Sequence, residues 1–181
     1  MRDMVYLSDK RQAPESPPAI QTLRISAQAF APYGDLLEAP AQPGRSNFVA
    51  NFENHRPHAC ANIALVRCDA AEGRLRIDEM ECHPFSSQIF FPLDVNDYLV
   101  VVAKDDGAGN PDPGTLVAFQ VSHPQGINYH PGTWHIGMIA LSHPGTFALL
   151  VHEDGSADDC RFRRVGPFTV AVSQESSPSD D

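Results

Sequence analysis

The apolar runs of this chain are short, and the segments between them are rich in Gly, Pro, Asp and Asn. The longest uninterrupted run covers residues 98–103, whereas a membrane-spanning helix needs about 20 apolar residues. Short apolar runs bounded by turn-forming residues are typical of β-strands. We predict strands at residues 63–67, 75–82, 88–92, 98–103, 116–121, 138–141, 147–151 and 168–172.

This strand pattern predicts an all-β fold, in the form of a jelly roll or an antiparallel β-barrel with few short helices. Strands do not alternate with long helices, which argues against a doubly wound α/β fold. One short helix is expected at residues 27–30, where Ser26 can cap the first turn and Pro32 and Gly34 can end it.

The length of the chain, 181 residues, suits a single domain. We place that domain at residues 20–172. Residues 1–19 and 173–181 are predicted to be disordered tails, because proline, serine and acidic residues replace the apolar pattern there.

The charge and the cysteines exclude several classes of partner. A formal net charge of -10 at pH 7 argues against nucleic acid, whose phosphates need Lys and Arg, and against docking on an anionic membrane. The four cysteines contain no C-x-x-C pair, so neither a disulfide framework nor a thiolate zinc site is expected. These features predict a reduced, cytoplasmic protein that binds a small molecule.

The densest group of chemically active side chains surrounds one predicted turn. Pro131 and Gly132 suit a type II turn, because glycine accepts the positive φ of the third turn position. Such a turn is held rigidly by the strands behind it. Within eight residues the turn region carries Asn128, Tyr129, His130, Trp134 and His135. These side chains either form a functional site or belong to an ordinary turn whose rings cap the hydrophobic core.

A second polar group lies on a predicted strand. Alternate residues of a strand share a face, so Glu79, Glu81 and His83 point the same way if the strand at 75–82 runs on to His83. Charged groups on an inner face are costly to bury without partners, which indicates a lined cavity. Gln88 follows His83 after five residues.

The two groups together resemble the two motifs of the cupin superfamily. Glu81-x-His83-x-x-x-x-Gln88 stands where the first motif has His-x-His and then Glu, and the second motif corresponds to the Pro-Gly-x-x-His segment that ends at His135. Glu81, His83 and His135 provide one carboxylate and two imidazoles, a set that can hold a divalent transition metal with open positions. Gln88 would be a weak fourth ligand. In the alternative, no metal binds, and the same groups hydrogen-bond one another and the substrate.

Four stretches of the chain resemble the ureidoglycolate lyase family, also called ureidoglycolate hydrolase. They are residues 29–35, the E-x-E-x-H-P-x-x-x-Q stretch at 79–88, the G-x-N-Y-H-x-x-x-W-H motif at 126–135, and a Gly-Ser pair with a following cysteine at 155–160. The two central stretches are the specific ones.

This resemblance implies a cupin-like β fold, a homodimer, a divalent metal such as nickel or a zinc-like ion, and cleavage of ureidoglycolate to glyoxylate and urea. The reaction needs a base for the hydroxyl proton and an acid for the leaving nitrogen. Imidazole titrates near neutrality, so His83 or His135 is a candidate base if it is not a ligand, and Tyr129 or His130 is a candidate acid. The side chains expected to bind the substrate are Asn128, Trp134, Gln88 and Glu79.

One region departs from the family pattern. Residues 45–52 stand where the family carries an Asn-x-Gly-Thr-like segment that is expected to contribute to substrate binding. Two alternatives therefore stay open: another cupin enzyme, such as an isomerase or a metal-dependent oxygenase, and a non-catalytic cupin that binds an organic acid. Arg45 and Arg67 are candidate anchors for a substrate carboxylate, although surface positions are commoner for arginine. His152 is a minor candidate for the pocket rim.

Overall fold

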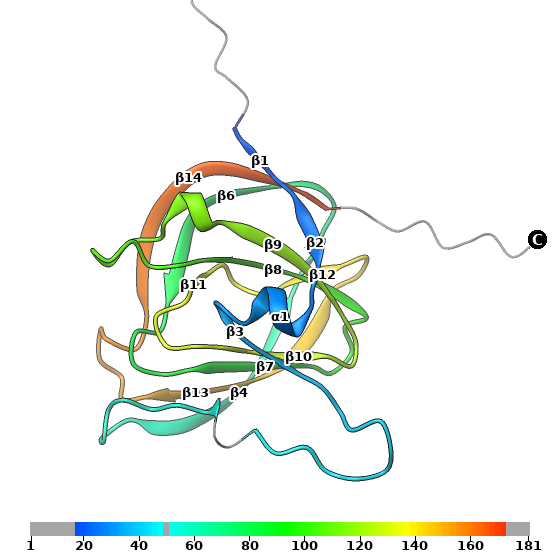
Figure 1. Ribbon diagram of the computed structural model, residues 1–181, viewed down its shortest axis with the longest axis vertical. Coiled ribbons are helices and arrows are strands. Elements are labelled where there is room, and N and C mark those ends of the chain that lie inside the picture. The colour runs from blue at the N-terminus through cyan, green and yellow to red at the C-terminus, as the bar shows by residue number, and fades with distance from the viewer. Residues whose placement is uncertain (1–16, 49–50, 173–181) are drawn as a thin grey trace, which may run out of the picture.

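The structure is a computed structural model that describes residues 17–48 and 51–172. Within these ranges the chain is mostly strand, with one short α-helix, α1 (Ala27–Phe30), and one 3-10 helix, η2 (Pro113–Thr115), as Figure 1 shows. The strands are β1 (Ala19–Ile20), β2 (Thr22–Arg24), β3 (Gly34–Leu37), β4 (Cys60–Cys68), β5 (Ala70–Ala71), β6 (Gly73–Cys82), β7 (Gln88–Pro92), β8 (Asp97–Ala103), β9 (Val117–Ser122), β10 (Gly126–Tyr129), β11 (Trp134–His135), β12 (Ile139–Leu141), β13 (Gly145–Glu153) and β14 (Arg161–Val172).

These strands form two sheets that close into a barrel-like body (Figure 1). The 9-stranded sheet has the order β1-β14-β6-β11-β8-β12-β5, and β9 pairs with β8 and with β2. The 5-stranded sheet has the order β3-β10-β7-β13-β4. Most pairs are antiparallel, and each parallel pair includes a strand of only two or three residues, namely β1, β2 or β5. The prediction of an all-β barrel with few short helices is confirmed.

The main core fills the space between the two sheets. Alternate residues of a strand point to the same side, so Tyr98, Val100 and Val102 of β8 meet Phe90 of β7 and Phe147 of β13 in one buried cluster. The rings of Tyr98 and Phe147 lie 5.1 Å apart and almost perpendicular, a favourable arrangement for aromatic pairs. This core supports the inner walls of both sheets.

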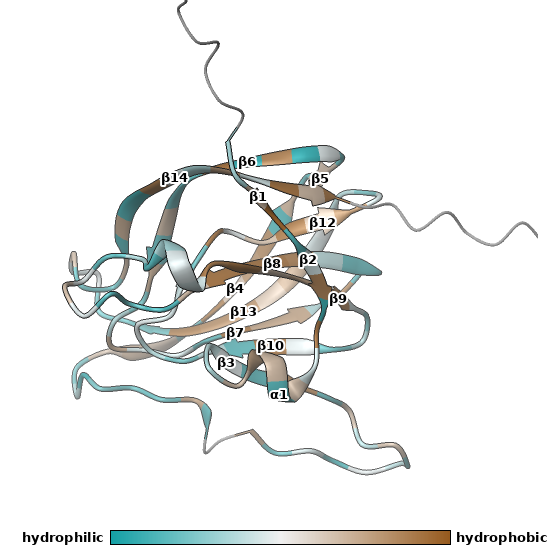
Figure 2. Ribbon diagram, turned by 45° about the horizontal axis from the view of Figure 1, so that its top comes forward, coloured by the Kyte–Doolittle hydropathy of each residue, from teal (hydrophilic) through white to brown (hydrophobic). Residues whose placement is uncertain are grey.

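A second core covers the opposite face of β8. Leu99, Val101 and Ala103 are buried there with Val165 and Val170 of β14. A strand that is buried on both faces has a continuous apolar sequence, which explains why residues 98–103 form the longest apolar run. Figure 2 shows this strand coloured as hydrophobic along most of its length.

The predicted elements are found with some changes of length. The helix lies at the predicted residues, and the Ser26 hydroxyl accepts a hydrogen bond from the Ala29 amide at 3.2 Å. The predicted strand at 168–172 is only the end of β14. Strands β1, β2, β3, β5, β10 and β11 were not predicted. The predicted tails lie outside the described residues, except that 17–19 are described and Ala19 begins β1.

Strand β3 lies very close to β10. Asp35 is directly opposite Asn128 in this antiparallel pair. A Cβ atom on Gly34 would lie 2.0 Å from the carbonyl oxygen of Asn128. Glycine is therefore needed at this position to let the two backbones approach.

The 5-stranded sheet has an apolar outer face, which points away from the main core. Its side chains are Ile63 and Leu65 of β4, Ile89 and Phe91 of β7, and Leu150 of β13. Ile63 is 74% exposed and Leu65 is 70% exposed. From the far end of β3, residues 38–48 form an arm that extends away from the body in both Figure 1 and Figure 2. None of the described helices is long and apolar enough to cross a membrane.

Candidate metal and active site

Three side chains meet inside the barrel at one end of β6. Glu81 of β6 is directly opposite His135 of β11 in an antiparallel pair, and His83 follows β6 immediately. One potential ligand atom from each of the three residues lies within 4.8 Å of the other two. The Nε2 atom of His135 is 3.5 Å from Oε1 of Glu81. The strand alternation predicted for Glu81 and His83 thus places both beside the histidine of the Pro-Gly turn.

Each imidazole is oriented by a backbone carbonyl. Nδ1 of His83 lies 2.7 Å from the carbonyl oxygen of Asp159, and Nδ1 of His135 lies 2.9 Å from that of Thr133. A carbonyl can only accept a hydrogen bond, so both rings carry their proton on Nδ1 when neutral. Both Nε2 atoms are buried and have no hydrogen-bond partner among the described residues. Two free nitrogen lone pairs therefore face the same small space as the Glu81 carboxylate.

The Pro-Gly turn fixes the position of His135. The amide of Thr133 donates to the carbonyl of His130 at 3.1 Å, and Gly132 has φ +80°. Pro131 and Gly132 therefore occupy the central positions of a type II turn, as predicted. The turn is attached to the rest of the barrel, because the Thr133 hydroxyl donates to the carbonyl of Tyr33 at 2.7 Å.

Tyr129 and Gln88 form the neighbouring part of the inner wall. They are directly opposite each other on β10 and β7. The ring of Tyr129 stacks on His135 at a centroid distance of 4.1 Å. The Tyr129 hydroxyl and Oε1 of Gln88 are buried without a hydrogen-bond partner among the described residues. Buried polar atoms normally have partners, so a group of such atoms around His83 and His135 indicates a place that a ligand fills.

Burial and neighbouring charges set the protonation states at this site. Burial raises the pKa of Glu81, but His135, His83 and the Cys160 thiol together lower it by more, so the net pKa lies below the usual value and the carboxylate is ionised at neutral pH. Burial, followed by repulsion from His135, lowers the pKa of His83. Burial also raises the pKa of Tyr129 well above its usual value. The site therefore holds a carboxylate, a neutral His83 and a phenol that keeps its proton.

Asn128 and His130 lie on the other side of β10. They flank Tyr129, so the alternation of the strand turns them away from the main core. The Asn128 amide donates to Oδ2 of Asp35 at 3.0 Å and to the carbonyl of Asn51 at 2.8 Å. Nε2 of His130 lies 3.2 Å from the same Asp35 oxygen. The structure brings Tyr129 to the Glu81, His83 and His135 group but does not bring Asn128 or His130 to it.

Trp134 and Glu79 also lie apart from that group. Trp134 is buried in the second core, and its indole N–H donates to Oδ2 of Asp105 at 3.0 Å. It is adjacent to His135 on β11, so its side chain points to the opposite face. Glu79 is exposed on β6, where it lies opposite Arg164 of β14.

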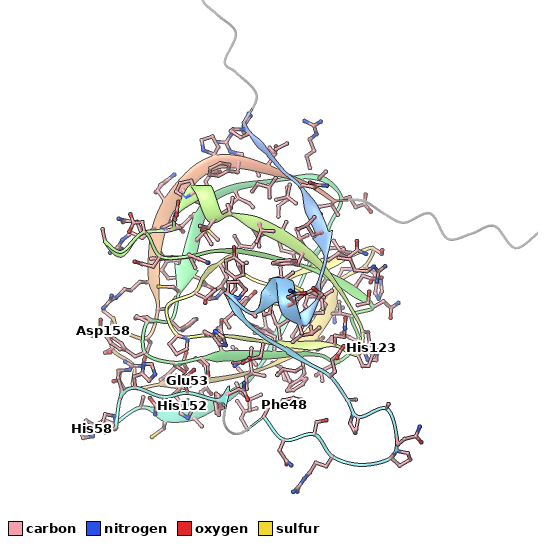
Figure 3. All side chains as sticks on the ribbon, in the orientation of Figure 1. Phe48, Glu53, His58, His123, His152 and Asp158 are labelled. Atoms are coloured by element: carbon pink, nitrogen blue, oxygen red, sulfur yellow. The ribbon has the colours of Figure 1, made fainter. Side chains whose placement is uncertain are left out.

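The candidate arginine anchors and His152 lie at other surfaces. Arg45 is exposed on the arm, and Arg67, whose side chain is 65% exposed, forms an ion pair with Asp94 at 3.6 Å. His152 stacks on Phe52 at a centroid distance of 4.1 Å. Figure 3 shows His152, which belongs to β13, and His123 on opposite sides of the body.

Two neighbours of the site come from the segment before β14. Asp159 supplies the carbonyl that orients His83, and the Cys160 thiol lies 3.6 Å from Oε2 of Glu81. Burial and the Glu81 carboxylate raise the pKa of Cys160 to about 12, so it is a protonated thiol at neutral pH. The sequence signal for these contacts is only the short Gly-Ser and cysteine motif at 155–160, which carries no information about which atoms meet.

The donor set fits a divalent transition metal. Two imidazole nitrogens and one carboxylate are a donor set that can hold such an ion with open coordination positions. Each histidine is hydrogen-bonded through Nδ1 to an outer carbonyl, which is the usual arrangement for a metal-ligating histidine. The Glu81, His83 and His135 group could thus hold a metal ion while a substrate binds beside it. We call this group the candidate metal and active site.

Together, the fold and this site define a β-barrel protein with a buried two-histidine, one-carboxylate centre in its interior. The sequence profile of the ureidoglycolate lyase family matches residues 17–172. The chain belongs to this family of enzymes, which confirms the resemblance found in the sequence.

Several relatives match most of this chain. The ureidoglycolate lyase of Pseudomonas entomophila is 34% identical over 145 residues, which cover 75% of this chain and 85% of that protein. That of Pseudomonas aeruginosa is 35% identical over 153 residues, covering 78% and 89%. A putative ureidoglycolate lyase of Agrobacterium fabrum is 33% identical over 135 residues, covering 75% and 83%. Among solved structures, RmlC from Streptococcus suis in complex with dTDP-D-xylose has a TM-score of 0.36 and 14% identity over 55% of this chain and 46% of that chain.

Proposed function

We propose that this chain is a ureidoglycolate lyase that releases urea and glyoxylate at the candidate metal and active site. The observation that carries this proposal is the convergence of Glu81, His83 and His135 in the interior of a chain that belongs to the family. The two Pseudomonas relatives named above are ureidoglycolate lyases, and the match covers most of their length.

The reaction needs neither a covalent nucleophile nor a redox step. The reacting carbon of ureidoglycolate carries a hydroxyl group, a carboxylate and the ureido nitrogen. The hydroxyl proton leaves as the C=O bond of glyoxylate forms, and the C–N bond breaks with its electron pair going to nitrogen. That nitrogen takes up a proton and urea departs. A proton acceptor and a proton donor on the two sides of this carbon are sufficient.

Tyr129 is the proton donor in this proposal. Its raised pKa keeps the phenol protonated, and its hydroxyl has no hydrogen-bond partner among the residues described. Gln88 lies directly opposite on β7 and offers an amide to a polar group of the substrate. His130 was the other candidate acid. We assign it instead, with Asn128, to holding β10 against Asp35.

Glu81, His83 and His135 would hold a divalent ion such as nickel. When bound, the ion would supply positive charge that makes the substrate hydroxyl more acidic and attracts the carboxylate. Without an ion, the neutral Nε2 of His83 is the proton acceptor that the site offers. The two arrangements differ in whether activity survives removal of metal.

We also propose that the protein is a homodimer that uses the apolar outer face of the 5-stranded sheet. Exposed Ile63 and Leu65 on the edge strand β4 form a surface that usually marks an interface. An apolar hollow of about 320 Å³ continues this face and is lined by Phe48, Phe52, Ile89, Phe91 and Leu150. Light scattering of wild type and Leu65→Asp tests this, because a charge on the face should give monomers.

The free state of the cysteines supports a cytoplasmic location.

The activity is tested by incubating the purified protein with ureidoglycolate and measuring urea and glyoxylate in equal amounts. One sample is stripped with a chelator, and portions of it are reloaded with Ni²⁺, Zn²⁺ or Mn²⁺. We expect loss on stripping and recovery with one or more of these ions. Oxygen consumption is recorded in parallel, since a two-histidine, one-carboxylate set also serves non-haem iron oxygenases. Oxygen uptake without urea release would favour an oxygenase, and binding without any turnover would favour a non-catalytic acid-binding protein.

A further inference from the structure

Arg56 lies outside the candidate metal and active site, yet it contacts two segments next to it, the loop before β14 and the residues that follow His83. Its guanidinium is ion-paired with the carboxylate of Asp159, and with Oδ1 of Asp154 at 3.0 Å. It also lies over the ring of Phe85, 5.7 Å from the centroid. Phe85 is two residues after His83. The Arg56 side chain is only 14% exposed, so these contacts are partly shielded from water.

The Asp159 carboxylate organises the loop before β14. Besides the Arg56 pair, it accepts hydrogen bonds from the backbone amides of Asp154 at 3.0 Å and Gly155 at 2.7 Å. Arg56 also donates to the Ser156 hydroxyl of this loop at 3.2 Å and to the carbonyl of His152, near the end of β13, at 3.4 Å. Figure 3 marks the loop by Asp158. Several bonds therefore hold the Asp159 side chain and its loop in place, and with them the carbonyl of residue 159; each involves Arg56 or the carboxylate that it neutralises.

This loop makes two contacts with the site. The Asp159 carbonyl orients Nδ1 of His83 at 2.7 Å, and the next residue places its thiol against Glu81. If the Asp159 carbonyl moves away, His83 loses the hydrogen bond that favours a proton on Nδ1. A ring with the proton on Nε2 presents no lone pair to the interior and cannot bind metal there.

We propose that Arg56 is a positioning residue that acts through Asp159 to hold His83 in its Nδ1-protonated form, with Nε2 directed into the site. This inference rests on the proposed function for its catalytic meaning, but the orientation itself can be measured without substrate. Arg56 contacts neither Glu81 nor His135 and acts only through the chain around His83.

Arg161 provides a matched control for the packing and the charge of Arg56. It lies over the same Phe85 ring, 5.6 Å from the centroid. It also pairs with an aspartate of the same loop, Asp158, at 2.9 Å. Its described contacts include neither the side chain nor the carbonyl of Asp159. A loss of stacking on Phe85 or of one loop ion pair would therefore affect Arg161→Met as much as Arg56→Met.

The experiment measures the tautomer of His83 and the affinity for Ni²⁺ in the full chain. Long-range ¹H–¹⁵N NMR spectra of the ¹⁵N-labelled, metal-free protein report which ring nitrogen carries the proton, and His83→Gln identifies the signal. Calorimetric titration gives the Ni²⁺ dissociation constant. We expect wild type and Arg161→Met to show a protonated Nδ1 only. In Arg56→Met we expect both tautomers and an affinity about 10–100-fold weaker, the usual effect of losing outer-shell support.

Arg56→Lys should restore part of the Nδ1-protonated population of His83 and part of the Ni²⁺ affinity, because a lysine keeps the charge at Asp159 but cannot make the forked contacts. If Arg56→Met does not fold, Asp159→Asn gives the same test, since it retains the side-chain acceptor and the carbonyl but loses the charge. A wild-type tautomer and Ni²⁺ affinity in Arg56→Met, or an equal loss in Arg161→Met, overturns the proposal. If wild type releases no urea, the proposed function fails, and the tautomer measurement still decides the role of Arg56.

Discussion

His135→Asn is the substitution that separates the chemistry of the site from its folding. His135 is 1% exposed, its Nδ1 bonds the Thr133 carbonyl at 2.9 Å, and its ring stacks on Tyr129. The amide nitrogen of asparagine reaches nearly the position of Nδ1, so the bond to Thr133 can survive. Nε2, the atom that faces Glu81, has no counterpart in asparagine. The variant therefore removes the ligand or proton-transfer atom and the ring stacked on Tyr129, but keeps the bond to Thr133.

The two expected effects differ in size. Losing the stacked pair with Tyr129 should reduce the unfolding free energy by about 0.5–1.5 kcal/mol, a small part of the roughly 5–15 kcal/mol that keeps a domain folded. Losing a positioned acid or base typically lowers the rate by about 10²–10⁴-fold, which equals about 2.7–5.4 kcal/mol in activation free energy. Activity should collapse while the protein stays folded.

The assay is urea release at saturating ureidoglycolate, together with urea denaturation followed by circular dichroism. His55→Asn is the matched control, because the His55 side chain is 52% exposed and pairs only with Glu53 in the described contacts. This control should keep the wild-type rate. If His135→Asn retains a rate within about threefold of wild type, the site has been assigned to the wrong residues. A variant that is unfolded would instead show that the ring is needed for packing.

Three further predictions follow from the same structure. Tyr129→Phe should lower the rate of urea release at least about tenfold. Its unfolding free energy should be unchanged or higher, because the lost hydroxyl is buried without a partner among the described residues. An unchanged rate would show that Tyr129 is not the acid. In metal-free protein, the pKa of folded His83 lies below its usual 6.5, so the unfolded state binds more protons as the pH falls below about 6.5. Denaturation between pH 7 and 5 should show an unfolding free energy that declines with falling pH, by at most about 1.4 kcal/mol per unit for this group, and His83→Gln should flatten that decline. Gly34→Ala should reduce the unfolding free energy by about 1–3 kcal/mol or prevent folding, because its Cβ would lie 2.0 Å from a β10 carbonyl oxygen. Gly137→Ala is the control, since its Cβ would have nothing within 4 Å, and its stability should not fall. Equal stability of both variants would contradict the close approach of β3 and β10.

Several strands of the barrel, such as β6, β7, β8 and β13, could be predicted from sequence, and so could the three side chains that converge inside it. Residues 98–103 are apolar throughout because β8 is covered on both faces. Glu81 and His83 stand out because polar groups two apart on a buried strand need partners. The Pro-Gly pair predicts the turn before His135 because glycine takes φ +80° there.

What the sequence does not reveal is the side to which each residue of the second motif points. Asn128, Tyr129 and His130 form one motif, and β10 was not predicted as a strand, so nothing in the pattern separated them. Short strands such as β10 carry too few residues for an alternation to be recognised. Arg56 was missed for a different reason. Its partner Asp159 is 103 residues away along the chain, and only the folded chain brings the two together.

Alternate side chains of strand β10 face the barrel interior and the outer surface of the sheet, and this limits how the chain can change in length. Removing or adding one residue before Tyr129 would exchange the two rows of side chains. The phenol would then face Asp35 on the outside, and an amide and an imidazole would enter the barrel. Such a change cannot be made gradually, whereas the exposed arm at 38–48 can gain or lose residues without altering any strand register. Natural length variation in this chain should therefore be tolerated in the arm and absent between residues 126 and 135.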